Sequence, residues 1–337
     1  MSHPIPVTRH AVAFFFASVA ALVAEPAGAA DPGRTQMVIV SFDGAHDTRL
    51  WERSLEMGER TGARFTYFLS CTFLMSQENR SAYRAPGEKA GRSNVGFGAD
   101  RADVAIRLGH IWSAVQAGHE IANHGCGHFD GGTWSQTDWL DEFSQFDAAL
   151  AGAWKANGLG DAEPAGWAAF AADGVKGFRA PYLSAGDGLS GALRTKGFAY
   201  DASTVSRGPA EPVLKDGVAR FALPMIPEGP TARPVIAMDY NLFVRHSVGI
   251  ETPDRRDAFR DRTLSAFRTA LDSQYDGDRV PLQLGFHFVE MNGGAYWDAL
   301  EIFLAETCSK PDVACVSHIE ALSRFTRLTN RSLTPRF

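Results

Sequence analysis

The chain has no block of basic residues, and its one long apolar run lies at the N-terminus. Lysine and arginine total 33 against 39 aspartates and glutamates, so the net charge is −6. Because no basic face is present, nucleic acid is not an expected partner. No segment after the N-terminal run is long and apolar enough to span a bilayer, so we expect no membrane span in the mature protein.

Cysteine is also scarce, with four in 337 residues. Cys308 and Cys315 are close in sequence, which favours a local disulfide. Cys71 and Cys126 each follow a strand-like run, and we expect them to pair if those strands are neighbours. Four buried free thiols are the alternative. Cys126 also lies between two histidines, but we rank metal binding by its thiolate below pairing.

The N-terminal segment has the pattern of a secretory signal peptide. Arg9 and His10 precede the apolar run 11–24, and the small-residue sequence 27–29 follows it. This pattern predicts a signal peptide over 1–30 that is cleaved from the mature chain. A membrane anchor is the alternative, but the apolar run is short for a span. We therefore expect a periplasmic or secreted protein.

Strand-like and helix-like segments alternate through the rest of the sequence. We expect strands at 38–42, 63–70, 119–123, 175–178, 198–200, 235–239, 281–288 and 313–317. We expect helices at 48–61, 104–118, 139–154, 189–196, 264–275 and 296–307. This alternation predicts one α/β domain over 31–337, in which about seven parallel strands form a closed or nearly closed barrel with outer helices. The polar section 76–99 predicts a surface insertion.

Polar residues stand at the ends of several predicted strands. Asp43 follows the strand 38–42, and His124 and His128 follow the strand 119–123. The carboxyl ends of parallel barrel strands share one rim, so we expect these side chains to lie close together. Two imidazoles four residues apart can bind one metal ion if they face the same side. Hydrogen bonding within a loop is the simpler alternative.

An acid and a base can be assigned among these residues. A carboxylate after a buried strand is costly unless it is paired or functional, so Asp43 is a candidate general base. A helix-capping role is its alternative. His287, on the strand 281–288, is a candidate acid that protonates a leaving group. A buried structural histidine is the alternative there, and Asp239 is the expected partner that orients and tunes His287.

Four further residues are candidates for positioning the reactants. Arg179 lies in a turn that Pro181 makes rigid, and its guanidinium could hold a carboxylate. In the same turn, the backbone N–H of Tyr182 could face an oxyanion. A surface arginine beside an ordinary turn is the alternative. Asn292 and Trp297 follow the predicted strand 281–288 and are candidate substrate contacts, although helix packing is the default for Trp297.

These motifs, in this order, resemble those of the polysaccharide deacetylase family, closer to its chitin deacetylase-like branch, over about 37–321. Ser41-Phe-Asp43 is similar to the family's Thr-Phe-Asp-Asp-Gly string. His124-Gly-Cys-Gly-His128 is similar to its His-x-x-x-His metal motif. Arg179-Ala-Pro-Tyr182 is similar to its Arg-x-Pro-Tyr motif. Leu284-Gly-Phe-His287 is similar to its Leu-x-His region, with one extra residue.

The resemblance implies a distorted (β/α)-barrel that removes acetyl groups from an N-acetylated glycan such as chitin or peptidoglycan. It also implies a divalent metal, with zinc the first candidate, that activates the attacking water. Carried over by position, the implied site residues are the base Asp43, the acid His287, their partners Arg179 and Asp239, and the metal ligands His124 and His128.

The sequence departs from the family pattern at one position. Gly44 stands where the family has its second aspartate, which is a metal ligand. His46, Asp47 or Asp43 would then have to be the third ligand, and we take Asp47 as the candidate. The departure also motivates an alternative function, a catalytically inactive glycan-binding protein on the same fold. A third hypothesis is an amidase or esterase with a non-sugar substrate.

Overall fold

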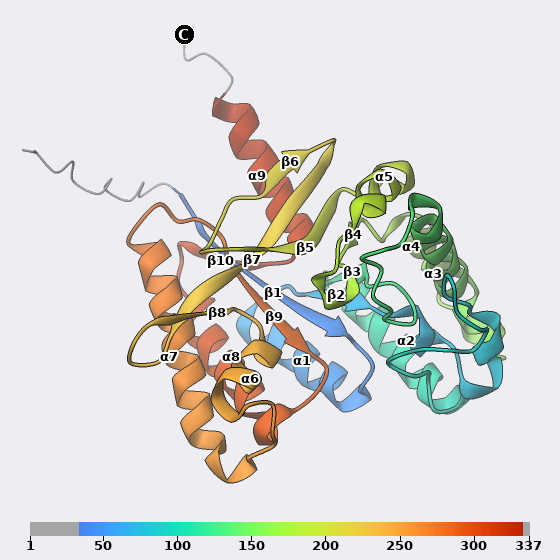
Figure 1. Cartoon of the computed structure of the whole chain (residues 1–337), viewed down its shortest axis with the longest axis horizontal. Coiled ribbons are helices and arrows are strands. Elements are labelled where there is room, and N and C mark those ends of the chain that lie inside the picture. The colour runs from blue at the N-terminus through green and yellow to red at the C-terminus, as the bar shows by residue number, and fades with distance from the viewer. Residues whose placement is uncertain (1–33, 333–337) are drawn as a thin grey trace, which may run out of the picture.

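The computed structural model describes residues 34–332, so the predicted signal peptide 1–30 lies outside the described residues. A ten-stranded sheet with helices around it forms the centre of the molecule (Figure 1). In chain order the strands are β1 (Gln36–Gly44), β2 (Thr66–Leu69), β3 (Glu120–Asn123), β4 (Gly177–Phe178), β5 (Tyr200–Ser206), β6 (Val213–Lys215), β7 (Val218–Glu228), β8 (Arg233–Ile236), β9 (Leu282–His287) and β10 (Val313–Val316).

Strand β1 lies at the middle of this sheet. It pairs in parallel with β9 along one edge, and with β10 and β2 along the other. From β2 the parallel ladder continues through β3, β4 and β5 to β7, whereas β6 and β8 pair with β7 in the antiparallel sense. No continuous ladder closes the sheet among residues 34–332. Its two ends meet at a single bridge between Met238 and Gly285. The predicted α/β barrel is thus confirmed, as a distorted barrel that stays open.

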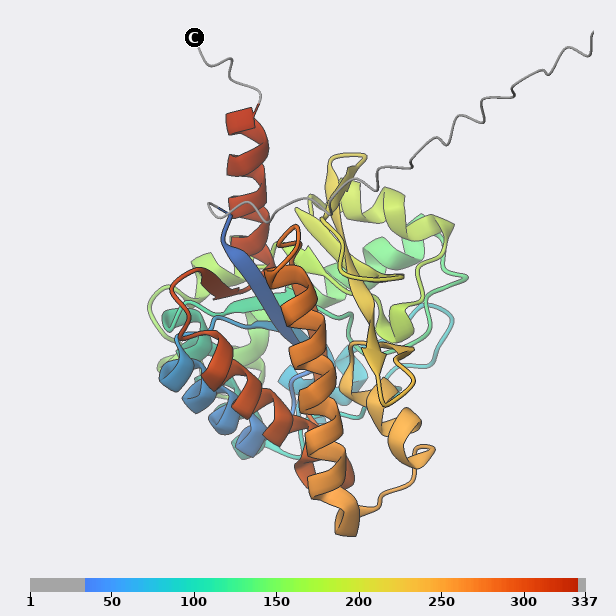
Figure 2. The ribbon, with the colours of Figure 1, turned by 90° about the vertical axis from the view of Figure 1, so that its left-hand side faces the viewer.

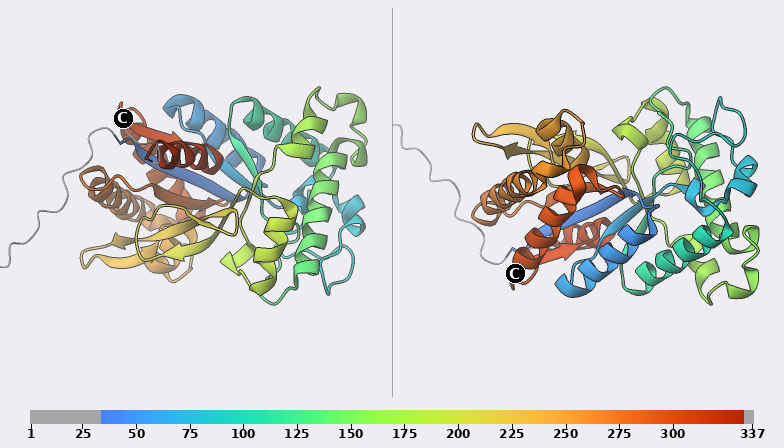
Figure 3. Two further views of the ribbon diagram at one scale, coloured as in Figure 1. Left: turned by 90° about the horizontal axis from the view of Figure 1, so that it is seen from above. Right: turned by 90° about the horizontal axis from the view of Figure 1, so that it is seen from below.

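Helices cover the outside of this sheet. They are α1 (Thr48–Thr61), α2 (Arg101–Gln116), α3 (Gln136–Ala156), α4 (Trp167–Asp173), α5 (Asp187–Lys196), α6 (Asp239–Ser247), α7 (Arg256–Tyr275), α8 (Ala295–Thr307) and α9 (His318–Ser332). Helices α7, α8, α1, α2 and α3 pack each against the next around the barrel (Figures 2 and 3). Within residues 34–332, no helix has the length and apolar character needed to cross a bilayer.

Local signals in the sequence explain where the main helices begin and end. The side chain of Asp47 accepts two backbone N–H groups in the first turn of α1, and Gly62 ends this helix in the left-handed conformation at φ 71°. Helix α3 begins after Ser135, which exchanges hydrogen bonds with Asp138 in a capping box. The predicted helix at 48–61 is therefore confirmed.

The alternation of side chains along β1 separates two cores. Val40 and Phe42 pack outward into the core beneath the helices, while Ile39 packs into a second core inside the barrel. Because side chains alternate between the faces of a strand, Ser41 and Asp43 share the inner face with Ile39. The strand therefore buries its apolar residues and directs a carboxylate into the barrel near its rim.

One part of the sheet was not predicted. Strand β7 contains Pro224 and Pro227, and no strand was predicted between residues 200 and 235. Proline cannot donate a ladder hydrogen bond, so this segment lacks the usual pattern of a strand. The prediction of a strand over 235–239 was also partly wrong. Strand β8 ends at Ile236, and Asp239 is instead the first residue of α6.

Candidate active site

The predicted base and acid are neighbours at the carboxyl rim of the barrel. Asp43 lies one residue before the end of β1, and His287 is the last residue of β9. The register of the two parallel strands pairs these residues directly. Paired residues of neighbouring strands point to the same face, with Cα atoms about 5 Å apart. The two side chains therefore enter the same space.

Asp43 is held by a buried arginine. Its Oδ1 accepts a hydrogen bond of 2.8 Å from Nη1 of Arg179, which also donates to Oγ of Ser41 at 2.8 Å. Nε of Arg179 donates to the carbonyl of Ala202, and the guanidinium lies 4.2 Å from the ring centroid of Phe68. Arg179 is 0% exposed and Asp43 is 4% exposed. The structure thus places Arg179 on the carboxylate, as the sequence predicted.

This environment keeps Asp43 ionised. Burial alone would raise the pKa of the carboxyl group, because a low-dielectric surrounding disfavours the charged form. The charge of Arg179 is the largest of the influences that together outweigh burial and lower the pKa of Asp43 below its usual value. At neutral pH the side chain is therefore a carboxylate that can accept a proton from water.

The pKa of His287 is shifted in the opposite direction. Burial lowers its pKa, but the carboxylate of Asp239 outweighs burial, and the net pKa of His287 is raised. Oδ1 of Asp239 lies 2.7 Å from Nδ1 of His287, and Oδ2 accepts the His287 backbone N–H at 2.8 Å. Asp239 is fully buried, whereas the side chain of His287 is 32% exposed. The contact at Nδ1 leaves Nε2 available to a substrate.

The two remaining predicted histidines also lie at this rim. His124 directly follows β3, and its Nδ1 is 2.8 Å from the carbonyl oxygen of Arg179. The ring centroids of His124 and His128 are 5.0 Å apart. Burial lowers the pKa of His124, and burial together with His124 lowers the pKa of His128 to about 3. Both imidazoles are therefore neutral at physiological pH, which is the state that binds metals.

The donors nonetheless fall short of a catalytic zinc centre. Among residues 34–332, no group of three or more histidine, cysteine, aspartate and glutamate side chains could hold a metal ion. The predicted third ligand, Asp47, caps α1 and pairs with Arg49, so this assignment was wrong. Asp43 is engaged by Arg179, and Cys126 is in a disulfide. Catalytic zinc usually takes three protein ligands, so the residues present do not fit such a centre.

The loop that carries the two histidines is tightly anchored. The predicted disulfide between Cys71 and Cys126 is present, as is the one between Cys308 and Cys315. The Cys71–Cys126 bond ties the loop to the residues that follow β2. The backbone N–H of Cys126 donates to Oε1 of Glu142 at 2.6 Å.

The insertion 76–99 contributes to the same anchoring. The hydroxyl of Tyr83 accepts the backbone N–H of Gly127 at 3.0 Å and donates to Glu142. The N–H of Asn94 donates to the Gly127 carbonyl at 2.8 Å. Neither Tyr83 nor Glu142 was predicted from the sequence to contribute to the site. Glu142 alone gave a signal, because it is an acidic residue on the apolar face of α3.

Two exposed tyrosines lie beside two of the histidines at the rim. Tyr182 is 60% exposed, its ring centroid lies 4.6 Å from that of His128, and its backbone has φ 57°. In the described part of the chain its backbone N–H has no hydrogen-bond partner. Tyr240 is 54% exposed, and its ring centroid lies 6.2 Å from that of His287. The opening thus has an aromatic ring next to each of two histidines.

Two predicted substrate contacts were wrong. Asn292 is fully buried, with Oδ1 accepting the Thr252 N–H at 2.8 Å and Nδ2 donating to the hydroxyl of Tyr296 at 2.9 Å. Trp297 is also fully buried, and its indole N–H donates to the backbone carbonyl of His287 at 3.1 Å. Both side chains shape the protein behind the site and do not reach its opening.

Comparison with solved structures identifies the fold. A protein from Mycobacterium smegmatis described as a polysaccharide deacetylase is 19% identical, with 92% of this chain and 96% of that chain covered and a TM-score of 0.54. Another so described, from Pseudomonas aeruginosa PAO1, is 14% identical, with 88% and 93% covered and a TM-score of 0.53. Puue allantoinase is also 14% identical, with 88% and 92% covered and a TM-score of 0.52.

No protein-family model and no curated protein sequence matches the chain. At these identities the likeness to solved structures establishes the fold, which is that of the polysaccharide deacetylases. The fold predicted from the motifs is thereby confirmed. The chitin deacetylase-like branch stays a prediction.

Proposed function

We propose that this protein hydrolyses N-acetyl groups of a glycan, with Asp43 as the base and His287 as the acid. The observation that carries the proposal is the direct pairing of these residues across β1 and β9, with pKa values shifted in opposite directions. Titratable groups whose pKa values are pushed apart by their surroundings are the usual arrangement for acid–base chemistry at neutral pH.

The proposed reaction uses one water molecule. Asp43 takes a proton from the water, whose oxygen attacks the acetyl carbonyl to form a tetrahedral intermediate. The backbone N–H of Tyr182 donates to the oxyanion. His287 then gives its proton to the amide nitrogen, the C–N bond breaks, and acetate and a free amine leave. This sequence requires an ionised Asp43 and a protonated His287.

The surroundings of the site support a glycan as the substrate. Tyr182 and Tyr240 offer exposed ring faces on which the C–H faces of sugars can stack. Tyr240 also lines a hollow of about 620 Å³, together with Asn241 and the apolar side chains of Met225 and Val244. Such a hollow can hold a sugar unit next to the one that reacts.

Metal dependence enters this proposal in a limited form. His124 and His128 are neutral imidazoles suited to zinc, but the described residues supply no third protein ligand. Zinc bound there would act as a Lewis acid on the acetyl group. No step above is assigned to a metal ion, because the donor set does not fit a three-ligand centre.

We also propose that the mature protein is exported to the periplasm or secreted. The signal-peptide pattern over 1–30 motivates this part of the proposal. The two disulfides support it, because such bonds persist in oxidising compartments.

Acetate release tests the function directly. The mature protein is incubated with chitin oligomers, peptidoglycan fragments and small aryl acetates, and acetate is quantified. We expect acetate release from at least one glycan. In Asp43→Asn, kcat should fall about 10²- to 10⁴-fold, because a general base contributes a rate enhancement of this size. The absence of release from every glycan, by protein shown to be folded, would contradict the proposal.

The same panel separates the alternative functions. Gly44 and the incomplete donor set favour a catalytically inactive glycan-binding protein, which would bind the oligomers without releasing acetate. Release from aryl acetates alone would indicate a hydrolase with a non-sugar substrate. The fold shared with an allantoinase gives this third possibility some support.

A further inference from the structure

A tryptophan lies behind the proposed acid and touches both catalytic strands. The indole of Trp297 stacks on Phe42 with ring centroids 4.9 Å apart, and it meets Phe288 edge-on at 5.8 Å. Phe42 precedes Asp43, and Phe288 follows His287. The same indole donates its N–H to the backbone carbonyl of His287. Trp297 is therefore packed against the chain next to both reacting groups.

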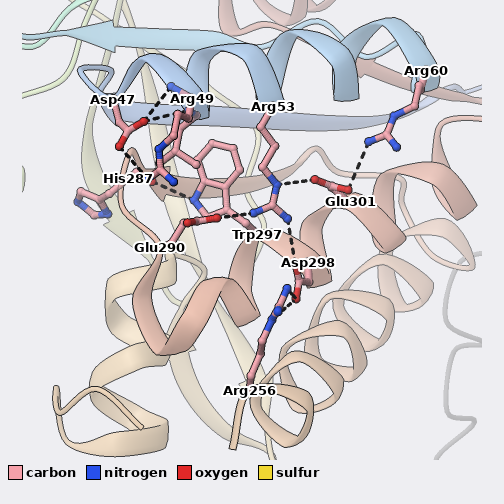
Figure 4. Close-up of polar contacts among 11 residues, drawn as sticks. Asp47, Arg49, Arg53, Arg60, Arg256, His287, Glu290, Trp297, Asp298 and Glu301 are labelled. Carbon is pink, nitrogen blue, oxygen red and sulfur yellow. Dashed lines mark hydrogen bonds and ion pairs between the residues drawn. The ribbon is translucent and has the colours of Figure 1, made fainter. Parts of the chain in front are cut away.

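An arginine on α1, Arg53, lies next to this tryptophan and binds three carboxylates around it, as Figure 4 shows. The guanidinium of Arg53 lies 5.5 Å from the Trp297 ring centroid. Its three nitrogens bind three carboxylates, those of Glu290 at 2.9 Å, Asp298 at 2.9 Å and Glu301 at 2.6 Å. Asp298 and Glu301 lie on α8, the helix of Trp297, and Glu290 lies in the segment after His287. Arg53 thus fastens α8 and this segment to α1.

We propose that Trp297, held by Arg53, is a positioning residue for His287, an inference that rests on the proposed role of His287 as the acid. Asp239 fixes the ring and the backbone N–H of His287, and Trp297 fixes the backbone carbonyl. The residue is therefore restrained on both sides of its Cα. Without the indole N–H, the carbonyl loses its partner and the imidazole can turn away from Asp239.

The consequence of this turn can be measured at the imidazole. Charged and titratable groups that act on His287 include Asp239, Asp43 and Arg179, together with the neutral His124 and His128. The carboxylate of Asp239 is the largest of the influences that favour the imidazolium form. A weaker contact with Asp239 therefore lowers the pH at which His287 loses its proton.

The test compares two tryptophan variants. Trp297→Phe removes the N–H but keeps an aromatic ring, and Trp167→Phe is the matched control, because the indole of fully buried Trp167 donates to the Leu150 carbonyl at 3.0 Å in another part of the protein. We expect Trp297→Phe to lower kcat about 10- to 100-fold with little change in KM, as misplaced catalytic groups do. In NMR titrations the His287 midpoint should also fall, whereas Trp167→Phe should change neither quantity.

A second pair of variants keeps the inference testable if Trp297→Phe does not fold. Arg53→Met removes the cation above the indole, and Arg60→Met is its control, since Arg60 also binds Glu301 but is 62% exposed. We expect Arg53→Met to lower the His287 midpoint and Arg60→Met to leave it unchanged. An unchanged midpoint in both Trp297→Phe and Arg53→Met would overturn the inference. The NMR readout needs no turnover, so it separates this failure from a failure of the proposed function.

Discussion

At the scale of single residues, the proposed chemistry depends on two side chains whose pKa values are set by their neighbours. Arg179 lowers the pKa of Asp43 in spite of the burial of the carboxylate, and Asp239 raises the pKa of His287 in spite of the burial of the imidazole. Each partner is itself fully buried and makes several hydrogen bonds. Water cannot easily replace either partner, so the pKa shifts of Asp43 and His287 persist.

Gly44, which stands where the polysaccharide deacetylase pattern has an aspartate, gives a prediction about zinc. An added Cβ at Gly44 would meet no atom within 4 Å, although the backbone there has φ +88°. We expect Gly44→Asp to supply a carboxylate near His124 and His128 and to raise zinc retention after dialysis against a chelator. The strained backbone should cost roughly 1–3 kcal/mol of stability.

Gly62→Asp is the matched control for this variant. Gly62 also has positive φ and an open Cβ position, but it ends α1 away from the two imidazoles. Its substitution should therefore leave zinc retention unchanged. Equal zinc retention in wild type and folded Gly44→Asp, measured by elemental analysis, would refute the idea that this position lacks a ligand.

Residues that act through hydrogen bonds in the fold could not be assigned from sequence. Asp43, His124, Arg179 and His287 were recognisable because each stands at a strand end beside a motif. Asp47 was misassigned, since a carboxylate that follows a strand by a few residues looks the same whether it caps a helix or binds a metal. The buried roles of Trp297 and Asn292 depend on side-chain direction, which the linear pattern does not contain.

At the scale of elements, the loop between β3 and α3 carries His124 and His128 and has little regular structure of its own. It is held by the Cys71–Cys126 disulfide, by Glu142 and by the insertion 76–99. The disulfide closes 55 residues of chain, which corresponds to roughly 4 kcal/mol in the chain-entropy description.

Removing this bond should therefore affect function as well as stability. We expect the double variant Cys71→Ser, Cys126→Ser to lose about 2–4 kcal/mol in denaturant unfolding and most of its acetate release. The control, Cys308→Ser with Cys315→Ser, removes a bond with a separation of 7 residues outside the rim and should keep its activity. Equal loss of activity in the two double variants would contradict a specific role for the histidine loop.

The elements themselves were predictable where their pattern was regular. The helix over 48–61 and the strands that carry Asp43 and His287 follow from amphipathic spacing and from residues such as Gly62. Strand β7 was missed because its two prolines mimic a connector. Pro227 lies in the half of β7 that pairs only with the short antiparallel strand β8, and Pro224 pairs with Ser206, the last residue of β5. Both prolines therefore lie where the ladder ends or has a single neighbour.

At the scale of the whole molecule, the barrel brings together residues from distant parts of the chain. The carboxyl ends of β1, β3, β4 and β9 meet at one rim, and the alternating pattern of the sequence was enough to predict this fold. The open seam at Met238 and Gly285 was not predictable, because it depends on the antiparallel strand β8. The seam lies next to Asp239, so the irregular part of the sheet is also where the acid receives its partner.

The central claim is that Asp43 works as an ionised base and His287 as a protonated acid tuned by Asp239. The pH dependence of kcat/KM for acetate release, compared between the wild type and Asp239→Asn, tests it most directly. For the wild type we expect kcat/KM to fall at high pH with an apparent pKa above the usual 6.5 of histidine. At low pH, kcat/KM should fall with an apparent pKa below the usual 3.8 of aspartate. In Asp239→Asn the imidazolium loses its carboxylate, so the alkaline limb should move to lower pH by about one unit or more. An alkaline limb that stays at the same pH in both proteins would contradict the account.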